Sequence, residues 1–255
     1  FDAVIGRGGL LCPLKGGVYE VNEKMKEDLL NATHEHACNL GALIADEIAR
    51  ECGCKAYIAD PVVVDEFPMK ARISGFPGIK RESIFHALNQ KATARQYAAS
   101  VGKKYEDMNL IVAHLGGGIS IGAHQKGKVI DVNNALNGEG PISPERAGTI
   151  PAEALVNLCF SGKYDIRQIK KMIHGKGGLT GYLGTNDMIT IESKAEAGEE
   201  PYRTLFEAML YTISKQIGAM YVEQMVRLYM PGEEHVPKRS IILHILNVLS
   251  MTKKL

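Results

Sequence analysis

The chain of 255 residues is 45% hydrophobic, so it can bury a sizeable core and is long enough for two modest domains. Its 30 Lys and Arg nearly balance 29 Asp and Glu, which leaves no broad basic surface for nucleic acid or anionic lipid. The five cysteines show neither zinc spacing nor the density of a secreted disulfide scaffold. No apolar run has membrane-spanning length and no signal peptide opens the chain, so we expect a cytoplasmic protein.

Helix-period patterns alternate with short apolar runs along the whole chain, which predicts an α/β fold. The chain begins without methionine, inside a strand-like run over residues 1–6, so we expect upstream sequence in the complete protein. Helices are predicted over 31–52, 82–101, 151–160, 166–173 and 201–229. Strands are predicted over 56–64, and then over 110–115, 119–125 and 128–133 as an antiparallel meander.

Two further patterns concern packing and motion. Inside the last predicted helix, apolar residues recur at helical spacing and predict a core-facing stripe: Leu205, Met209, Ile213, Ile217 and Met220. Residues 67–78 contain two prolines and two glycines and break the periodicity, so they are the predicted hinge.

A run of three glycines closes one predicted strand and opens the next. Gly116, Gly117 and Gly118 follow His114 and Leu115, and bare backbone N–H groups at such a turn can approach a phosphate. The run fits neither the P-loop nor the dinucleotide fingerprint, because no Lys-Ser/Thr and no helix follow it. Taken alone, it is more often a structural turn than a phosphate site.

Longer motifs favour a phosphate site over a purely structural turn. Residues 60–98, DPVVVDEFPMKARISGFPGIKRESIFHALNQKATARQYA, resemble the butyrate kinases almost throughout. FDAVIGRGG at 1–9, AHLGGGISIGAHQKGKVIDVNNALNGEGPISPERAGTIP at 113–151 and GTNDM at 184–188 follow the same family in the same order. The similarity extends from residue 1 to about residue 220.

Butyrate kinases belong with acetate kinase in the superfamily of actin, hexokinase and the heat-shock chaperone ATPases. The resemblance therefore implies the actin-like ATPase (ribonuclease H-like) fold, with two domains of mixed sheets flanked by helices. Residues 1–66 would be the remainder of the N-terminal domain. Residues 67–255 would form the C-terminal nucleotide-binding domain, truncated or divergent after about residue 224.

The resemblance also implies an activity. It is a phosphotransferase that reversibly phosphorylates butyrate with ATP, giving butyryl phosphate and ADP, with Mg²⁺, in a homodimer or higher homo-oligomer. A kinase for isobutyrate or another branched acid is the alternative within enzymes. Acetate kinase is less favoured because the GGG and PERAG segments follow the butyrate branch.

A third alternative is an inactive actin-like fragment or a nucleotide-binding module. The family's NPGSTSTK-like phosphate loop would lie upstream of Phe1, and its late Gly-Gly loop is not found after about residue 224. Residues 231–234, PGEE, are only faintly similar to the family's late PGE segment, whose acidic residue helps to bind magnesium. The acidic ligand there stays unassigned.

Two arginines match the substrate-side arginines of the family. Arg7 lies in IGRGG and Arg146 in PERAG, and a planar guanidinium grips a carboxylate or phosphate with two hydrogen bonds. By the resemblance, both neutralise the equatorial oxygens of the transferring group. Without that context, a single arginine is most simply a solvated surface charge.

The resemblance assigns two more catalytic residues. Asp65, after the apolar residues 61–64, matches the family's active-site aspartate, and a carboxylate at a strand end suits magnesium held directly or through water. Its alternative role is a turn or helix cap. His86 matches the histidine that donates to the transferring phosphoryl group, although a lone helical histidine is more often a packing residue.

The nucleotide-side assignments follow from the same motifs. His114 is expected to approach the nucleotide phosphates beside its glycines, and the loop near the adenosine is expected to contain Asn186, Asp187 and Met188. Two other groupings are not assigned to metals. His34 and His36 would point to different faces of a helix, and Cys52 and Cys54 lack a second pair.

Overall fold

The computed structural model describes residues 1–32 and 37–225. The chain divides into two compact units, one formed by Phe1–Met108 with Lys126–Asp131 and the other by Asn109–Gln125 with Val132–Leu255. The domain boundary predicted at residue 66 stays a prediction. His34, His36 and residues 231–234 lie outside the described residues, so the structure does not bear on what the sequence suggested for them.

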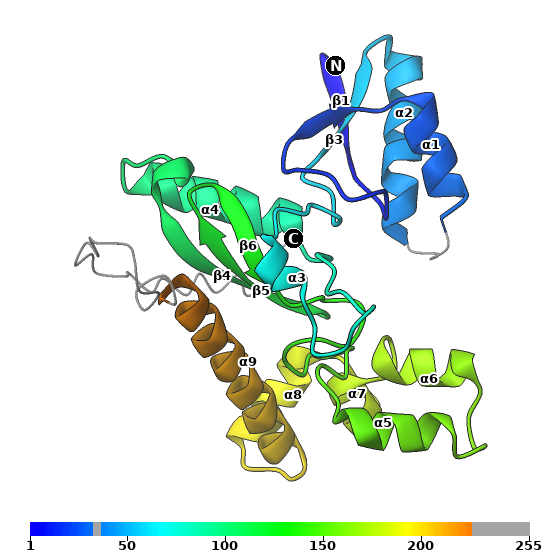
Figure 1. Cartoon of the computed structure of the whole chain (residues 1–255), viewed down its shortest axis with the longest axis vertical. Helices are drawn as coiled ribbons and strands as arrows, with labels where there is room; N and C mark the ends of the chain where they lie inside the picture. The colour runs from blue at the N-terminus through cyan, green and yellow to red at the C-terminus, as the bar shows by residue number, and fades with distance from the viewer. Residues whose placement is uncertain (33–36, 226–255) are drawn as a thin grey trace. The chain divides into compact units, whose positions relative to one another are not determined.

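A mixed three-stranded sheet forms the centre of the first unit. Its order is β1 (Ala3–Arg7), β3 (Lys55–Ala59), β2 (Val18–Glu20), with β1 parallel and β2 antiparallel to β3. The helices α1 (Glu23–Leu30) and α2 (Leu40–Cys52) lie on one side of this sheet (Figure 1). The strand predicted over residues 1–6 is confirmed as β1.

Small residues let α2 approach the sheet closely. A Cβ on Gly6 would collide with the carbonyl oxygen of Gly41, so glycine is required at this crossing. The buried face of α2 consists of alanines, and with β3 it forms the core of this layer: Ala42, Ala45, Ala49, Ala56 and Ile58. Because alanine adds little width, the backbones of helix and sheet lie near each other.

The helix predicted over 31–52 is correct only for its second part. The structure has α1 ending at Leu30, a 3₁₀ turn at Ala37–Asn39, and then α2. The sequence analysis missed α1, although Asn22 caps it by accepting a hydrogen bond from Met25 N at 2.9 Å. Asn followed by Glu before an apolar pattern is a typical helix start.

Two predicted elements around the candidate site are shorter than expected. The strand predicted over 56–64 ends at Ala59, because Asp60 has φ of 37° and Pro61 has no N–H to donate. The helix predicted over 82–101 is α4 (Ala87–Ser100), since Phe85 N bonds to Val62 O at 3.1 Å instead of continuing a helix. Both corrections involve contacts between segments distant in sequence, since Asp60 N also bonds to Gly17 O at 2.8 Å.

The predicted hinge at 67–78 contains a short helix, α3 (Met69–Arg72), and lies within the first unit. Its first residue, Phe67, is buried. The 3₁₀ turn η2 (Tyr105–Asp107) contacts α4 and supplies the buried Tyr105. Hinge motion at 67–78 stays a prediction.

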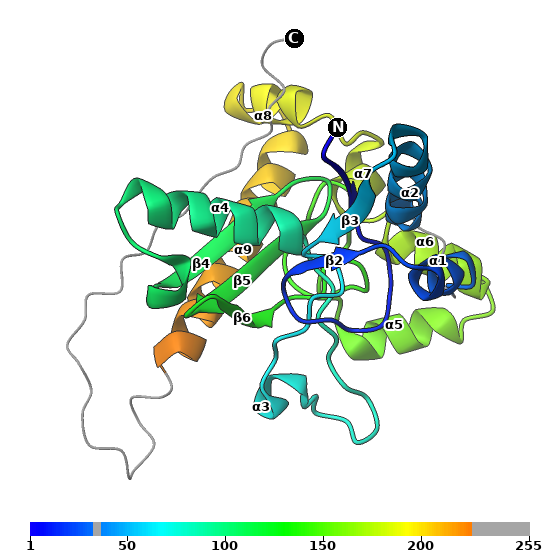
Figure 2. The same cartoon turned by 90° about the horizontal axis from the view of Figure 1, so that it is seen from above.

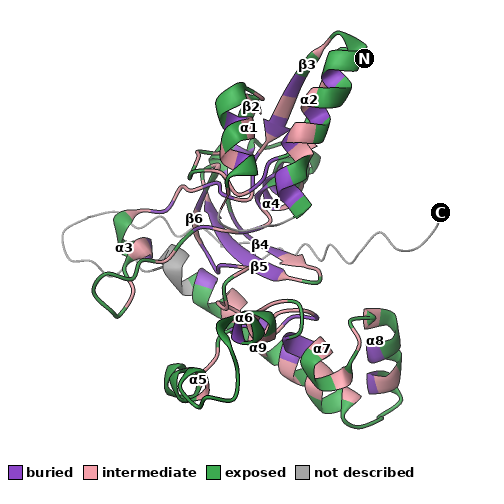
Figure 3. Cartoon of the chain, turned by 90° about the vertical axis from the view of Figure 1, so that its right-hand side faces the viewer, coloured by how far each residue is buried: buried purple, intermediate pink, exposed green. Residues whose placement is uncertain are grey.

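The second sheet has the order β4-β5-β6. In the second unit, β4 (Asn109–Leu115) pairs antiparallel with β5 (Ile119–Gln125) over their full lengths, from Asn109↔Gln125 to Leu115↔Ile119. With β6 (Lys128–Val132), these strands confirm the predicted meander within one or two residues. Figure 3 shows buried residues along β4 and β5, and all of β5 except Gln125 is buried.

The second unit contains five helices among its described residues. They are α5 (Ala152–Cys159), α6 (Ile166–Ile173), α7 (Gly178–Leu183), α8 (Met188–Glu196) and α9 (Tyr202–Met225). The predictions for α5 and α6 are confirmed, and that for α9 is confirmed up to Met225, since residues 226–229 of the predicted helix lie outside the described residues. Helices α7 and α8 were missed because glycines interrupt the first and polar residues dominate the second.

Helix α9 packs on β4 and β5, as well as on α7 and α8 (Figure 2). Its predicted apolar stripe is confirmed, since Met209, Ile213 and Met220 are buried. Although α9 has 24 residues, no helix in the described ranges is both long and apolar enough to cross a membrane.

Cys38 should be the slowest of the described cysteines to react with iodoacetamide. Its side chain is buried and burial raises the pKa of its thiol, whereas Cys12, Cys52 and Cys159 are exposed. Because the thiolate is the reactive form, we expect labelling at least about tenfold slower at Cys38. Pulse alkylation with peptide mapping measures this. Equal labelling of Cys38 and Cys12 in the folded protein would contradict the packing around residue 38.

Candidate active site

Arg7 is the last residue of β1 and is exposed. The glycines beside it have packing roles, because a Cβ on Gly6 would meet Gly41 O and a Cβ on Gly8 would meet the side chain of Pro61. Gly8, the residue after Arg7, therefore packs directly against Pro61. This contact places Arg7 near the segment that carries Asp65.

Asp65 follows a turn rather than the predicted strand. Val64 N bonds to Pro61 O at 2.9 Å, and Asp65 N bonds to Leu14 O at 2.7 Å. Only a single parallel bridge, between Leu14 and Val64, remains of the strand predicted at residues 61–64. These two hydrogen bonds fix the backbone at Val64 and Asp65.

The carboxylate of Asp65 is held by Arg72. Two short hydrogen bonds, Nη1 to Oδ2 at 2.6 Å and Nη2 to Oδ1 at 2.7 Å, make a bidentate pair, and Phe67 N donates to Oδ1 at 3.2 Å. The pair with Asp65 raises the pKa of Arg72. A carboxylate offers about four lone-pair sites, and these three bonds leave one on Oδ2. Asp65 thus keeps room for one more partner, such as a magnesium-bound water.

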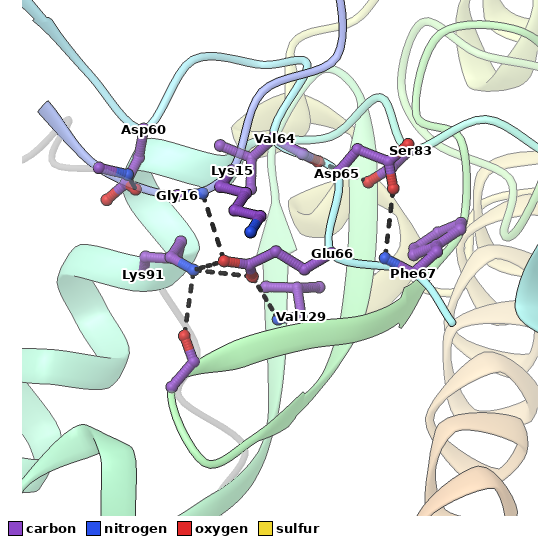
Figure 4. A network of polar contacts seen from close by, with 12 residues as sticks. Lys15, Gly16, Asp60, Val64, Asp65, Glu66, Phe67, Ser83, Lys91 and Val129 are labelled. Atoms are coloured by element: carbon purple, nitrogen blue, oxygen red, sulfur yellow. Dashed lines mark hydrogen bonds and ion pairs between the residues drawn. The ribbon is translucent and has the colours of Figure 1, made fainter. Parts of the chain in front are cut away.

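Glu66 forms a buried ion pair that the sequence did not reveal (Figure 4). Its two oxygens accept from Lys91 Nζ at 3.0 and 2.9 Å, and they also accept from Gly16 N at 3.3 Å and Val129 N at 2.7 Å. Lys91 Nζ also donates to Gly127 O at 3.1 Å. The side chains are 10% and 2% exposed, so the charges compensate each other away from water.

Asp60 extends this network toward the sheet. Its carboxylate accepts from Gly17 N at 2.8 Å and from Arg95 Nη1 at 2.7 Å. Lys91 and Arg95 both lie over the ring of Tyr105, at 5.8 and 5.9 Å, and burial raises the pKa of that phenol well above its usual range. The loop at Gly16 and Gly17 is therefore attached to α4 through two carboxylates.

His86 does not lie inside a helix as predicted but at the N-cap position of α4. The preceding residues hold it beside the Asp65 segment, because Ser83 Oγ donates to Val64 O at 2.7 Å and Phe85 N to Val62 O at 3.1 Å. The first unit thus brings Asp65 and His86 onto adjoining segments. The N-terminus of this 14-residue helix carries a partial positive charge.

In the second unit, the glycine run forms the turn between β4 and β5, with Gly117 exposed and Gly116 and Gly118 partly buried. His114 lies beside it, since a Cβ on Gly116 would stand 3.0 Å from the imidazole Nε2. Gly117 O accepts two hydrogen bonds, from Ser143 Oγ at 2.8 Å and from Glu145 N at 3.0 Å. These bonds tie the turn to the segment PERAG.

Arg146 lies next to this turn with an incomplete set of partners. Its Nη1 donates to Glu145 O at 3.1 Å and contacts Glu145 Oε2 at 3.5 Å. Within the described part of the chain, its buried Nε has no hydrogen-bond partner. An unsatisfied buried donor on a cation is unusual in a folded protein, and a bound anion would satisfy it.

The loop predicted near the adenosine, residues 184–188, also contacts Glu145. Asn186 Nδ2 donates to Glu145 Oε1 at 2.5 Å. Asp187 acts as the N-cap of α8, which begins at Met188, and its carboxylate accepts from Ile189 N and from Thr190 Oγ1, a bond that lowers its pKa. Asn186 is exposed in this loop and bonded to Glu145, while the carboxylate of Asp187 caps the helix.

Glu145 is the residue that connects these motifs, and the sequence analysis missed it. The GGG turn, Arg146 and the GTND loop all contact it. Its only sequence signal was its place before Arg146 in PERAG. Across 1–32 and 37–225, no cluster of three or more His, Cys, Asp or Glu forms a metal site, but nucleotide-bound magnesium needs only one or two carboxylates.

Comparison with known proteins identifies the family. Residues 66–229 match the Acetokinase family. This chain belongs to the Acetokinase family. It is 72% identical over 222 residues to a "Probable butyrate kinase" of Phocaeicola vulgatus, covering 87% of this chain and 63% of the relative. A second "Probable butyrate kinase", of Bacteroides thetaiotaomicron, is 56% identical over 219 residues, with 86% and 62% covered. The chain thus spans less than two thirds of these relatives' length.

Solved structures of the Acetokinase type share the fold. The acetate kinase of Porphyromonas gingivalis matches with a TM-score of 0.75 at 22% identity, over 88% of this chain and 59% of that chain. A propionate kinase of Francisella tularensis subsp. tularensis matches with a TM-score of 0.69 at 22% identity, over 86% and 60%. The predicted actin-like α/β fold is confirmed.

Removal of Lys91 should strongly destabilise the first unit. Lys91→Ala leaves the buried Glu66 carboxylate without its cation, and breaking such a pair costs about 3 to 5 kcal/mol. Lys103→Ala, an exposed control three residues after α4, should change stability by less than about 0.5 kcal/mol. Urea denaturation followed by circular dichroism measures both. Equal midpoints for the two variants would contradict a structural role for the pair.

Proposed function

We propose that the complete protein is an ATP:butyrate phosphotransferase. The observation that carries this proposal is the 72% identity, over 222 residues, to a relative named probable butyrate kinase. In the reaction, a carboxylate oxygen of butyrate attacks the γ-phosphorus while the bond to the ADP oxygen breaks. The products are butyryl phosphate and ADP. No proton is transferred, so the site needs cations and alignment rather than a general base.

The first unit supplies the substrate-side groups in this proposal. Arg7, exposed at the end of β1, binds an oxygen of the carboxylate or of the transferring phosphoryl group. His86, at the N-terminus of α4, donates to the same phosphoryl oxygens, and the partial positive charge of the helix favours an anion there. Asp65 is oriented by Arg72, which holds its carboxylate with two hydrogen bonds.

The second unit supplies the nucleotide side together with the second substrate-side arginine, Arg146. The turn at Gly116–Gly118 allows backbone approach to the phosphates, with His114 beside it. Arg146 has a buried, unpartnered Nε that a phosphoryl oxygen would satisfy, and this group counters charge in the transition state. Asn186, exposed in its loop, lies at the predicted adenosine side with Asp187 and Met188.

Magnesium fits this arrangement through Asp65. When bound with ATP, magnesium would neutralise charge on the β- and γ-phosphates. The free lone-pair site on Asp65 Oδ2 suits a metal-bound water, since Arg72 and Phe67 N occupy the other three sites. We also propose the cytoplasm as compartment, a homo-oligomer as the assembly, and closure of two domains about 67–78. Isobutyrate remains the competing substrate.

Exchange of the two arginines for lysine should reduce turnover while sparing ATP affinity. Lysine keeps the charge but loses the planar fork that meets two oxygens at once. Losing such a donor costs about 3 to 4 kcal/mol, roughly a hundred- to thousandfold in turnover. We expect Arg7→Lys and Arg146→Lys to lower kcat for butyrate strongly and to leave the KM for ATP within a few fold.

A coupled assay of butyrate-dependent ADP formation measures both constants. Arg167→Lys, an exposed arginine on α6, is the matched control and should keep normal kinetics. Near-normal turnover with weakened ATP binding would make the two arginines nucleotide ligands instead. An unsubstituted protein that forms no ADP in response to butyrate or isobutyrate would contradict the proposed function.

A further inference from the structure

Glu145 places a negative charge beside the turn expected to receive nucleotide phosphates. A Cβ on Gly117 would stand 3.1 Å from its Oε2, and its backbone N–H donates to Gly117 O. The side chain is 33% exposed, so its carboxylate faces a partly open site. A phosphate seated on this turn would lie within a few ångströms of a carboxylate.

The carboxylate cannot easily turn away from the glycines. Asn186 Nδ2 holds Oε1 at 2.5 Å, and Gly175 N bonds to the Glu145 carbonyl at 2.8 Å, which fixes the backbone. Arg146 is the cation paired with this carboxylate, with Nη1 3.5 Å from Oε2, and the same guanidinium is the group proposed to bind a phosphoryl oxygen. One guanidinium cannot neutralise both this carboxylate and a polyphosphate, so a bare polyphosphate would still meet like charge at this turn.

We propose that Glu145 makes nucleotide binding at the glycine turn selective for the metal complex over the free nucleotide. The inference rests on the proposed function, in which a nucleoside triphosphate binds here. A divalent cation on the phosphates removes the repulsion, because the carboxylate then faces a positive charge directly or through water. Free nucleotide keeps the repulsion and binds poorly. Glu145 is thus a specificity-determining residue, positioned by Asn186.

A purely structural role for Glu145 predicts something different. If its carboxylate only linked the GGG turn to the GTND loop, neutral glutamine would serve nearly as well, because its side-chain oxygen can still accept from Asn186 Nδ2. Its substitution would then affect both forms of the nucleotide equally. The ratio of the two affinities separates these roles, and neither stability nor turnover would do so.

Calorimetric titration with the β,γ-imido analogue of ATP tests the proposal. Each protein is titrated in excess magnesium and again in EDTA, at constant ionic strength. The preference of the unsubstituted protein for the magnesium complex should fall about tenfold in Glu145→Gln, since one unit charge near the phosphates is removed. The preference should fall because Glu145→Gln binds the metal-free analogue more tightly than the unsubstituted protein does.

Two further variants complete the test. Glu145→Asp keeps the charge and should retain most of the preference, whereas Glu207→Gln, on an exposed position of α9, should behave as the unsubstituted protein. An unchanged ratio in Glu145→Gln would overturn the inference while leaving the proposed function intact. Failure of the unsubstituted protein to bind the analogue in either condition would overturn both.

Discussion

The buried ion pair between Glu66 and Lys91 is the interaction on which the first unit depends. Four hydrogen bonds to Glu66 bring together the loop at Gly16, helix α4 and the start of β6. A charge held so far from water is stable only while all of its partners are present. The Glu66 carboxylate therefore links the loop, helix and strand, and Asp60 adds a second link between the loop and the helix.

The position of Asp65 follows from this constraint. Because Glu66 points to Lys91, the preceding side chain points elsewhere, and Arg72 holds it with a bidentate pair. Two neighbouring carboxylates thus have separate counterions and separate tasks. Glu66 has a structural role, while Asp65 keeps one lone-pair site for the proposed metal-bound water. In the second unit, Glu145 has a comparable linking position but is partly exposed, which suits a group that acts on a ligand.

The sequence predicted well those elements whose pattern is local. The bounds of β5 and α6 agree with the prediction, because alternation or helical period runs unbroken through each. Prediction was wrong where distant contacts decide the backbone. Asp60 adopts φ of 37° while bonded to Gly17, and Phe85 bonds to Val62, so β3 ends early and α4 starts late.

In the candidate site, too, local motifs could be read from the sequence and contacts between distant residues could not. Motifs predict site roles for Arg7, Asp65, His86 and Arg146, and these stay predictions, whereas the partners of these residues could not be predicted. Arg72, Lys91 and Glu145 look like ordinary charged residues in the sequence, and their importance depends on what the fold places opposite them. A buried donor without a partner, as at Arg146 Nε, is likewise visible only in three dimensions.

Direct observation of the transferred group tests the central claim most sharply. The protein is incubated with ATP labelled with ³²P at the γ-position, magnesium and butyrate, and the products are then separated before and after hydroxylamine treatment. The account predicts label in an acyl phosphate that forms only with butyrate or a close branched analogue and is released by hydroxylamine. Label that stays on the nucleotide, or appears solely as inorganic phosphate, would contradict it.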